Sequence, residues 1–187
     1  NPQWIYLKGN HEQMLEDAIW ENIDKEDFDW ATSLLYNNGG EQTLKDFFLD
    51  REQSDDIHFS SSWVKFFTGL PACATYSSAQ GEIFMSHSGH IDWNPVVRRQ
   101  SQIKECLWNR EHFNFPWDNE QTQYDFVIHG HTPIPYVIED VEGLTPTTWV
   151  PGAYWYCNNH KCCIDNGSFS TGITCLLDLN TFDEHIF

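Results

Sequence analysis

The sequence predicts an α/β protein in which helices come first and strands dominate the second half. Helical periodicity with capping and stop residues occupies much of the region up to residue 68. After residue 71, short runs of apolar, β-branched and aromatic residues alternate with turn residues. Neither repeats nor low-complexity linkers interrupt the chain, so we expect one continuous, layered α/β piece.

The first half yields one strand and four helices. Trp4–Leu7 is predicted to be a strand, followed by a helix around Gln13–Asn22. Asp27 is expected to cap a second helix that runs through Tyr36 and ends at Asn37-Asn38-Gly39-Gly40. Two further helices are then expected, at Thr43–Leu49 and Ser61–Thr68. Gly69-Leu70-Pro71 is expected to end the second of them.

The second half is read as strands around a single helix. The helix is expected near Gln100–Trp108. The first two strands should pair as a hairpin around Gln80-Gly81. The predicted strands, in order, are Ala72–Ser77, Glu82–Ser86, Tyr124–His129, Tyr136–Glu139, Cys162–Asp165 and Ile173–Leu179.

Three short blocks place metal-capable side chains beside glycine, each after an apolar run. They are Gly9-Asn10-His11-Glu12, Ser86-His87-Ser88-Gly89 and His129-Gly130-His131-Thr132-Pro133. If each apolar run is a strand, the blocks meet at the strand ends and form one site. One amide oxygen and two imidazoles suit Mn, Fe or Zn better than Mg or Ca, which prefer oxygen ligands alone.

These blocks, in this order, resemble the serine/threonine phosphatase branch of the calcineurin-like metallophosphoesterases, and the lambda-phosphatase type in particular. That family carries five blocks: G-D-x-H-G, G-D-x-x-D-R-G, G-N-H-E, H-A-G and G-H-T-P. The last three match here, with Ser88 in place of alanine. Further likeness extends along the chain, at Gln13-Met14-Leu15, Asn38-Gly39-Gly40, Leu107-Trp108-Asn109-Arg110-Glu111 and Ile164-Asp165-Asn166-Gly167.

The first two family blocks are absent from the sequence. The resemblance therefore implies that residues 1–187 are the C-terminal part of a single metallophosphoesterase domain. The expected fold is the four-layer α/β/β/α sandwich without its first β-α-β portion. Because the absent blocks supply the other metal ligands, we expect these residues alone to be inactive.

The resemblance also implies roles for five residues. Asn10, His87 and His131 match the ligands of one ion of a two-metal centre, and the cofactor is expected to be two divalent ions, Mn with Fe or Zn as alternatives. His11 matches the histidine that protonates the leaving group, and Arg110 matches the arginine that binds the phosphate.

The implied function is hydrolysis of phosphoesters in a phosphorylated protein or a small molecule. A symmetric bis(5'-nucleosyl)-tetraphosphatase shares these blocks and remains an alternative. A truncated, non-catalytic phosphatase-like binding protein is another. The blocks leave the natural substrate and the oligomeric state open.

Composition restricts the partners. The formal net charge of −18 disfavours nucleic acid, whose binding requires Lys and Arg to neutralise phosphates. No apolar run of about 18 residues predicts a membrane helix, and no leader marks secretion, so we expect a cytoplasmic protein, in the host cytoplasm if a phage encodes it. The six cysteines are expected to be reduced. Cys157–Cys163 is read as a hairpin, with structural zinc as the alternative.

Overall fold

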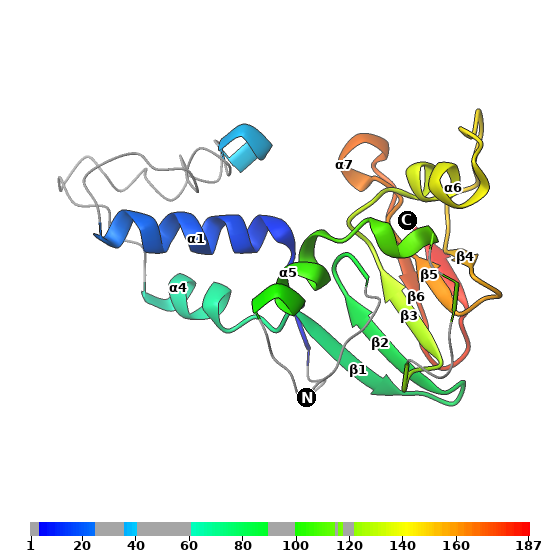
Figure 1. Ribbon diagram of the computed structural model, residues 1–187, viewed down its shortest axis with the longest axis horizontal. Helices are drawn as coiled ribbons and strands as arrows, with labels where there is room; N and C mark the ends of the chain where they lie inside the picture. The colour runs from blue at the N-terminus through cyan, green and yellow to red at the C-terminus, as the bar shows by residue number, and fades with distance from the viewer. Residues whose placement is uncertain (1–3, 25–35, 41–60, 90–99, 115, 118–121) are drawn as a thin grey trace. The chain divides into compact units, whose positions relative to one another are not determined.

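The computed structural model describes residues 4–24, 36–40, 61–89, 100–114, 116–117 and 122–187 (Figure 1). The chain divides into two compact units, which are described separately below. One unit is Lys8–Pro71, and the other joins Asn1–Leu7 to Ala72–Phe187. The helix expected at Thr43–Leu49 lies outside the described residues, and so does the helix expected from Asp27 to Tyr36, apart from Tyr36 itself.

The smaller unit contains α1 (Asn10–Asp24), η1 (Tyr36–Gly40) and α4 (Ser61–Thr68). The predictions of α1 and α4 are confirmed, although α1 begins three residues earlier than expected. The N-terminus of α1 is held by the Glu12 carboxylate, which accepts a hydrogen bond of 2.9 Å from the Gly9 N–H. This is one half of a capping box, in which the third helical residue reaches back to the residue before the helix.

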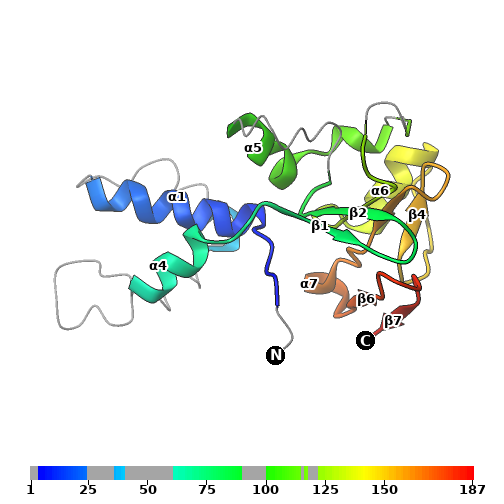
Figure 2. The same cartoon turned by 90° about the horizontal axis from the view of Figure 1, so that it is seen from below.

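The larger unit is built on a five-stranded mixed sheet, so the prediction of an α/β fold is confirmed. The strand order is β1-β2-β3-β5-β4, and β2, β3 and β5 run parallel to one another. The edge strands β1 and β4 are antiparallel to their neighbours, and a separate two-stranded sheet pairs β6 with β7 (Figure 2). The strands are β1 (Cys73–Ser77), β2 (Glu82–Ser86), β3 (Phe126–His129), β4 (Tyr154–Tyr156), β5 (Lys161–Cys163), β6 (Cys175–Leu177) and β7 (Glu184–Ile186).

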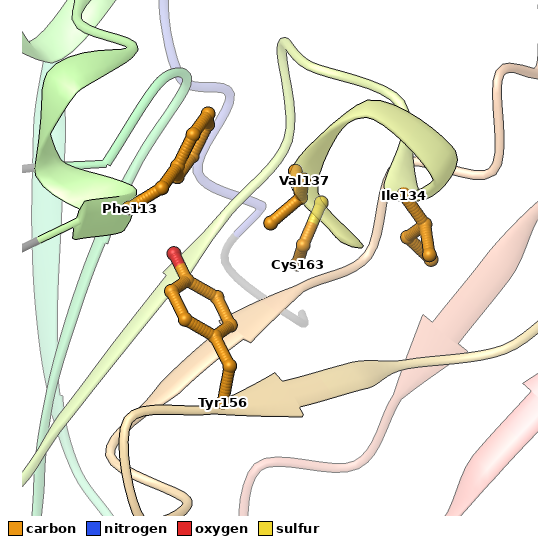
Figure 3. Close-up of a cluster of buried hydrophobic side chains, with 5 residues drawn as sticks. All are labelled: Phe113, Ile134, Val137, Tyr156 and Cys163. Atoms are coloured by element: carbon orange, nitrogen blue, oxygen red, sulfur yellow. The ribbon is translucent and has the colours of Figure 1, made fainter. Parts of the chain in front are cut away.

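The helices of this unit pack on one face of the five-stranded sheet. They are α5 (Gln100–Trp108), η3 (Glu111–Asn114) and α6 (Ile134–Glu142), while the short α7 (Ser168–Thr171) follows β5. Phe84 and Val127 pack against Cys106 of α5, and Cys163 and Tyr156 pack against α6 (Figure 3). The opposite face, which includes Ile83, Ile128 and Cys162, packs against Leu177, Leu179 and Phe182.

The prediction that Trp4–Leu7 forms a strand is wrong. These residues have no regular secondary structure, and the side chains of Trp4, Ile5 and Tyr6 are 75%, 63% and 60% exposed. A strand needs a neighbour for its backbone hydrogen bonds, and the strand pairings of the described residues include none with this segment. The apolar run alone could not reveal this, because it specifies composition but not a partner.

The predicted strand Tyr136–Glu139 is also wrong, since these residues lie in α6. The apolar residues Ile134, Val137, Ile138 and Val141 recur at helical spacing, and Ile134 and Val137 are buried. Pro135 occupies the first turn, where proline is tolerated, and Gly143 ends the helix with a φ of 69°. A segment of four residues is too short to distinguish the 3.6-residue repeat of a helix from the two-residue repeat of a strand.

The predicted hairpin at Cys157–Cys163 is found, and it pairs β5 with β4, a strand that was not predicted. Its turn contains Cys157, Asn158 and Asn159 with φ of 50°, 55° and 64°. No disulfide links any of the six cysteines, and burial raises the pKa of Cys163 to about 12. None of the described helices combines the length and the hydrophobicity that crossing a membrane requires.

Candidate functional site

The candidate site lies where the parallel strands end. The carboxyl ends of β2, β3 and β5 meet at one edge of the sheet, and His87, His131 and Asp165 follow these three strands. Backbone hydrogen bonds hold the three loops together there. Gly130 N–H donates to His87 O at 2.9 Å, Ile164 N–H to His129 O at 2.9 Å, and Ile134 N–H to Asp165 O at 2.8 Å.

The structure brings the imidazoles of His87 and His131 together. Nε2 of His87 lies 3.1 Å from Nδ1 of His131, and the ring of Trp108 lies edge-on to His131 at 6.1 Å. Metal–nitrogen bonds of about 2.0–2.1 Å at right or tetrahedral angles separate two ligand nitrogens by roughly 2.8–3.4 Å. The separation of 3.1 Å lies in this range, and it is also the length of a hydrogen bond between the two rings.

His131 adopts a left-handed backbone conformation with a φ of 67°. This conformation is uncommon outside glycine, and it persists where the surroundings impose it, often at functional sites. Here Gly130 is hydrogen-bonded through its N–H to His87 and through its carbonyl to the Thr132 N–H at 2.8 Å. The strained residue is thus the one that aims a ring nitrogen at His87.

The third predicted metal ligand, Asn10, and the predicted proton donor, His11, lie in the smaller unit. Asn10 is buried at the first position of α1, and His11, beside it, is exposed. Lys8 is buried and forms an ion pair with Glu16, so its charge is directed to that carboxylate. Within the described residues, no group of three His, Cys, Asp or Glu side chains is arranged to hold a metal ion.

Arg110 lies between α5 and η3 with an exposed side chain. Among the described residues, its guanidinium has no ion-pair or hydrogen-bond partner. The preceding residue shapes the turn, because Asn109 Oδ1 accepts hydrogen bonds from the N–H groups of Glu111 at 2.7 Å and His112 at 3.2 Å. Arg110 therefore extends from an ordered turn while its five donors remain available for an anion.

Ser88 connects this turn to the His87 loop, a role that its sequence did not reveal. Its side chain is fully buried, and the hydroxyl donates to Glu105 O at 2.7 Å and accepts from the Asn109 N–H at 3.0 Å. The Ser88 N–H also donates to Cys106 O at 2.8 Å. The C-terminus of α5 is thus attached to the loop that carries His87.

We expect Ser88→Ala to lower the free energy of unfolding by about 1 kcal/mol, because the two hydrogen bonds of the Ser88 hydroxyl are lost while the Asn109 N–H still donates to Glu105 O at 3.1 Å. Urea unfolding monitored by circular dichroism measures the change. Ser77→Ala is the matched control, since Ser77 is exposed at the end of β1, and its replacement should stay within about 0.5 kcal/mol. Equal stability of Ser88→Ala and Ser77→Ala would contradict the bridging role.

Gly89 allows a second buried imidazole to approach the His87 loop. A Cβ at Gly89 would lie 2.4 Å from Nε2 of His112, and the φ of Gly89 is 89°. Both the contact and the backbone conformation therefore require glycine. His112 is fully buried and packs edge-on against Phe113 and His129, with ring centroids 4.3 and 4.8 Å away.

His129, the last residue of β3, is buried beneath the same loops. Its Nε2 lies 2.8 Å from the Tyr156 hydroxyl and its Nδ1 lies 3.1 Å from Gly130 O. The pKa of His129 is lowered to about 4, chiefly by burial and to a lesser degree by the nearby charges of Lys161 and His87, while the hydrogen bond to Gly130 opposes the shift. Burial also lowers the pKa of Lys161, which donates to His112 O at 2.6 Å.

The depressed pKa of His129 makes stability depend on pH. In the unfolded chain His129 binds a proton below its ordinary pKa of 6.5. In the folded chain it binds that proton only below about pH 4. Stability is therefore complete above pH 6.5 and falls, by roughly 3 kcal/mol from this residue, as the pH drops to 4. Urea unfolding at several pH values, compared between the wild type and His129→Gln, isolates this contribution. Identical pH slopes would contradict it.

Asp165 has a defined local role. Its carboxylate accepts a hydrogen bond of 2.8 Å from the Gly167 N–H, and this stabilises the turn after β5.

A separate open pocket of about 350 Å³ is lined by α6 and the segment leading into β4, with Ile138, Trp149 and Tyr154 among its walls. None of the predicted site residues lines that pocket, so the site is defined by the strand-end histidines instead.

The chain matches neither a model of a known protein family nor a curated protein. Function is therefore inferred from the sequence blocks and from the chemistry of the side chains that the fold brings together.

Proposed function

We propose that this chain belongs to a metal-dependent phosphoester hydrolase, a phosphatase of the serine/threonine protein phosphatase type. The observation that carries the proposal is the contact of 3.1 Å between the His87 and His131 imidazoles at adjacent strand ends. Two convergent nitrogens within the blocks S-H-S-G and H-G-H-T-P suit ligands of a first-row divalent ion. Strained backbone at His131 supports the same assignment.

In this proposal each residue acts through its own chemistry. His87, His131 and Asn10 would hold one of two divalent ions. When bound, the ions would supply Lewis-acid chemistry toward the phosphoryl oxygens and a water molecule. His11 transfers its proton to the leaving oxygen as the phosphorus–oxygen bond breaks. Arg110 binds the phosphoryl oxygens through its planar donors, which match two oxygens at once.

The surrounding architecture is compatible with the four-layer α/β/β/α sandwich that we propose for the complete domain. Helices pack on one face of the five-stranded sheet, and residues around the β6–β7 sheet pack on the other. In the proposed two-metal centre, the second ion would need further ligands of the kind that carboxylates and imidazoles supply. The substrate is a phosphorylated protein or a small phosphoester, in the cytoplasm.

Metal dependence tests the proposal directly in the full-length protein. Excess chelator should abolish hydrolysis of nitrophenyl phosphate, and Mn²⁺ should restore it. Isothermal titration calorimetry with Mn²⁺ provides the second readout, and the double variant His87→Ala/His131→Ala should lose most of the binding heat. Hydrolysis that persists in excess chelator would remove the proposed function.

A further inference from the structure

The buried pair Tyr156–His129 forms a hydrogen-bond chain with only one consistent direction. Gly130 O can only accept, so Nδ1 of His129, 3.1 Å away, carries the ring proton. In the neutral ring, Nε2 then has a lone pair and must accept, so the Tyr156 hydroxyl donates to it over 2.8 Å. The tautomer of His129 is thereby fixed by its two partners.

The chain ends on the peptide unit that carries His131. The carbonyl of Gly130 accepts hydrogen bonds from both His129 Nδ1 and the Thr132 N–H, and the Gly130 N–H donates to His87 O. The bond that follows this peptide is the N–Cα bond of His131, and its dihedral angle φ is 67°. Because a left-handed residue costs about 1–3 kcal/mol, bonds that fix the adjacent peptide are needed to keep it there.

Tyr156 is well placed to anchor this arrangement. It is 5% exposed, and its ring rises from β4 with the hydroxyl pointing away from that strand toward the segment of Phe113 (Figure 3). Its ring packs edge-on against the ring of Phe113 at 6.3 Å and that of His129 at 5.9 Å. The hydroxyl therefore has little freedom to leave the Nε2 atom.

We propose that Tyr156 and His129 are positioning residues that hold the Gly130–His131 peptide and thereby keep Nδ1 of His131 3.1 Å from Nε2 of His87. The inference rests on the proposed function where it concerns metal binding, because Nδ1 of His131 is then a metal ligand. Neither side chain touches the ion or the substrate. Both act through the conformation of His131, as the partners behind metal-binding histidines do elsewhere.

Tyr156→Phe tests the proposal, because it removes only the hydroxyl oxygen. Tyr154→Phe is a closely matched control. Tyr154 lies on the same strand, its ring stacks on that of Tyr156 at 5.7 Å, and its hydroxyl bonds to Glu142 of α6 instead of His129. If removal of any tyrosine hydroxyl from β4 disturbed the histidines, both variants would show the effect. If Tyr156 has the positioning role, only Tyr156→Phe should show it.

Two measurements by nuclear magnetic resonance need no metal. Imidazole ¹⁵N shifts should show His129 as the Nδ1–H tautomer in the wild type and as a mixture in Tyr156→Phe. The nuclear Overhauser effect between the His87 and His131 rings should weaken in Tyr156→Phe and persist in Tyr154→Phe. An Nε2–H tautomer in the wild type, or an unchanged ring contact in Tyr156→Phe, overturns the proposal.

A third measurement is the Mn²⁺ affinity from calorimetry. Tyr156→Phe should weaken it about tenfold, the lower end of the range for partners behind metal ligands, and Tyr154→Phe should leave it unchanged. His129→Asn, which keeps an amide donor at the position of Nδ1, should retain more affinity than His129→Gln. Equal affinities in Tyr156→Phe and the wild type would overturn the proposal. A wild type that binds no Mn²⁺ would remove the proposed function, while the two metal-free measurements still decide the positioning role.

Discussion

If the protein is the proposed metal-dependent phosphatase, replacing His131 by alanine should reduce its hydrolysis of nitrophenyl phosphate by roughly 10³-fold. The variant removes one of the two imidazole nitrogens that the fold places 3.1 Å apart. Stabilisation of transition-state charge by a bound ion contributes several kcal/mol, and each 1.36 kcal/mol corresponds to a factor of about ten in rate. Asn10→Ala should act in the same direction, because Asn10 is proposed to hold the same ion.

The expected loss has two features that separate it from unfolding. Excess Mn²⁺ should restore part of the activity of His131→Ala, because a weakened site is filled by mass action. His185→Ala is the matched control, since His185 is exposed on β7 and remote in sequence from the three blocks, and its activity should equal that of the wild type. Full activity of His131→Ala at low Mn²⁺ would show that His131 holds no ion.

The sequence predicted the elements whose signals are local. The β1–β2 hairpin, β3 and α5 were placed closely, because each combines an alternating or periodic apolar pattern with turn residues at its ends. The strands β4 and β7 were missed because they are defined by pairing with β5 and β6, and a local pattern cannot identify such partners. Trp4–Leu7 shows the converse, an apolar run without the neighbour that would make it a strand.

The contact between His87 and His131 could also be predicted from local sequence patterns. Each residue follows a predicted strand, and parallel strands end at one edge of a sheet. The residues that hold these histidines in place could not be predicted from local patterns, because they come from distant segments of the chain. Ser88 meets α5, His112 meets Gly89, and Tyr156 reaches His129 across β5, and each contact depends on a register that the chain acquires only on folding.

The proposed roles of His11 and Arg110 predict different dependences on the leaving group. If His11 donates a proton to the leaving oxygen, its loss should matter most when that oxygen is a poor leaving group. His11→Asn should therefore lower kcat by about 10²–10⁴-fold on a phosphoserine peptide, whose alkoxide needs protonation. The loss on nitrophenyl phosphate should be much smaller, since nitrophenolate leaves readily without a proton. Steady-state kinetics on both substrates measure the two ratios.

Arg110 should behave differently, because it binds phosphoryl oxygens that both substrates share. Arg110→Ala should raise KM by similar factors on the two substrates, and it should lower kcat as well if the guanidinium binds more tightly in the transition state. The side chain is exposed and has no partner among the described residues, so its removal should leave the fold intact and the loss should report anion binding. A loss for His11→Asn that is equal on both substrates would instead assign His11 to positioning water or metal.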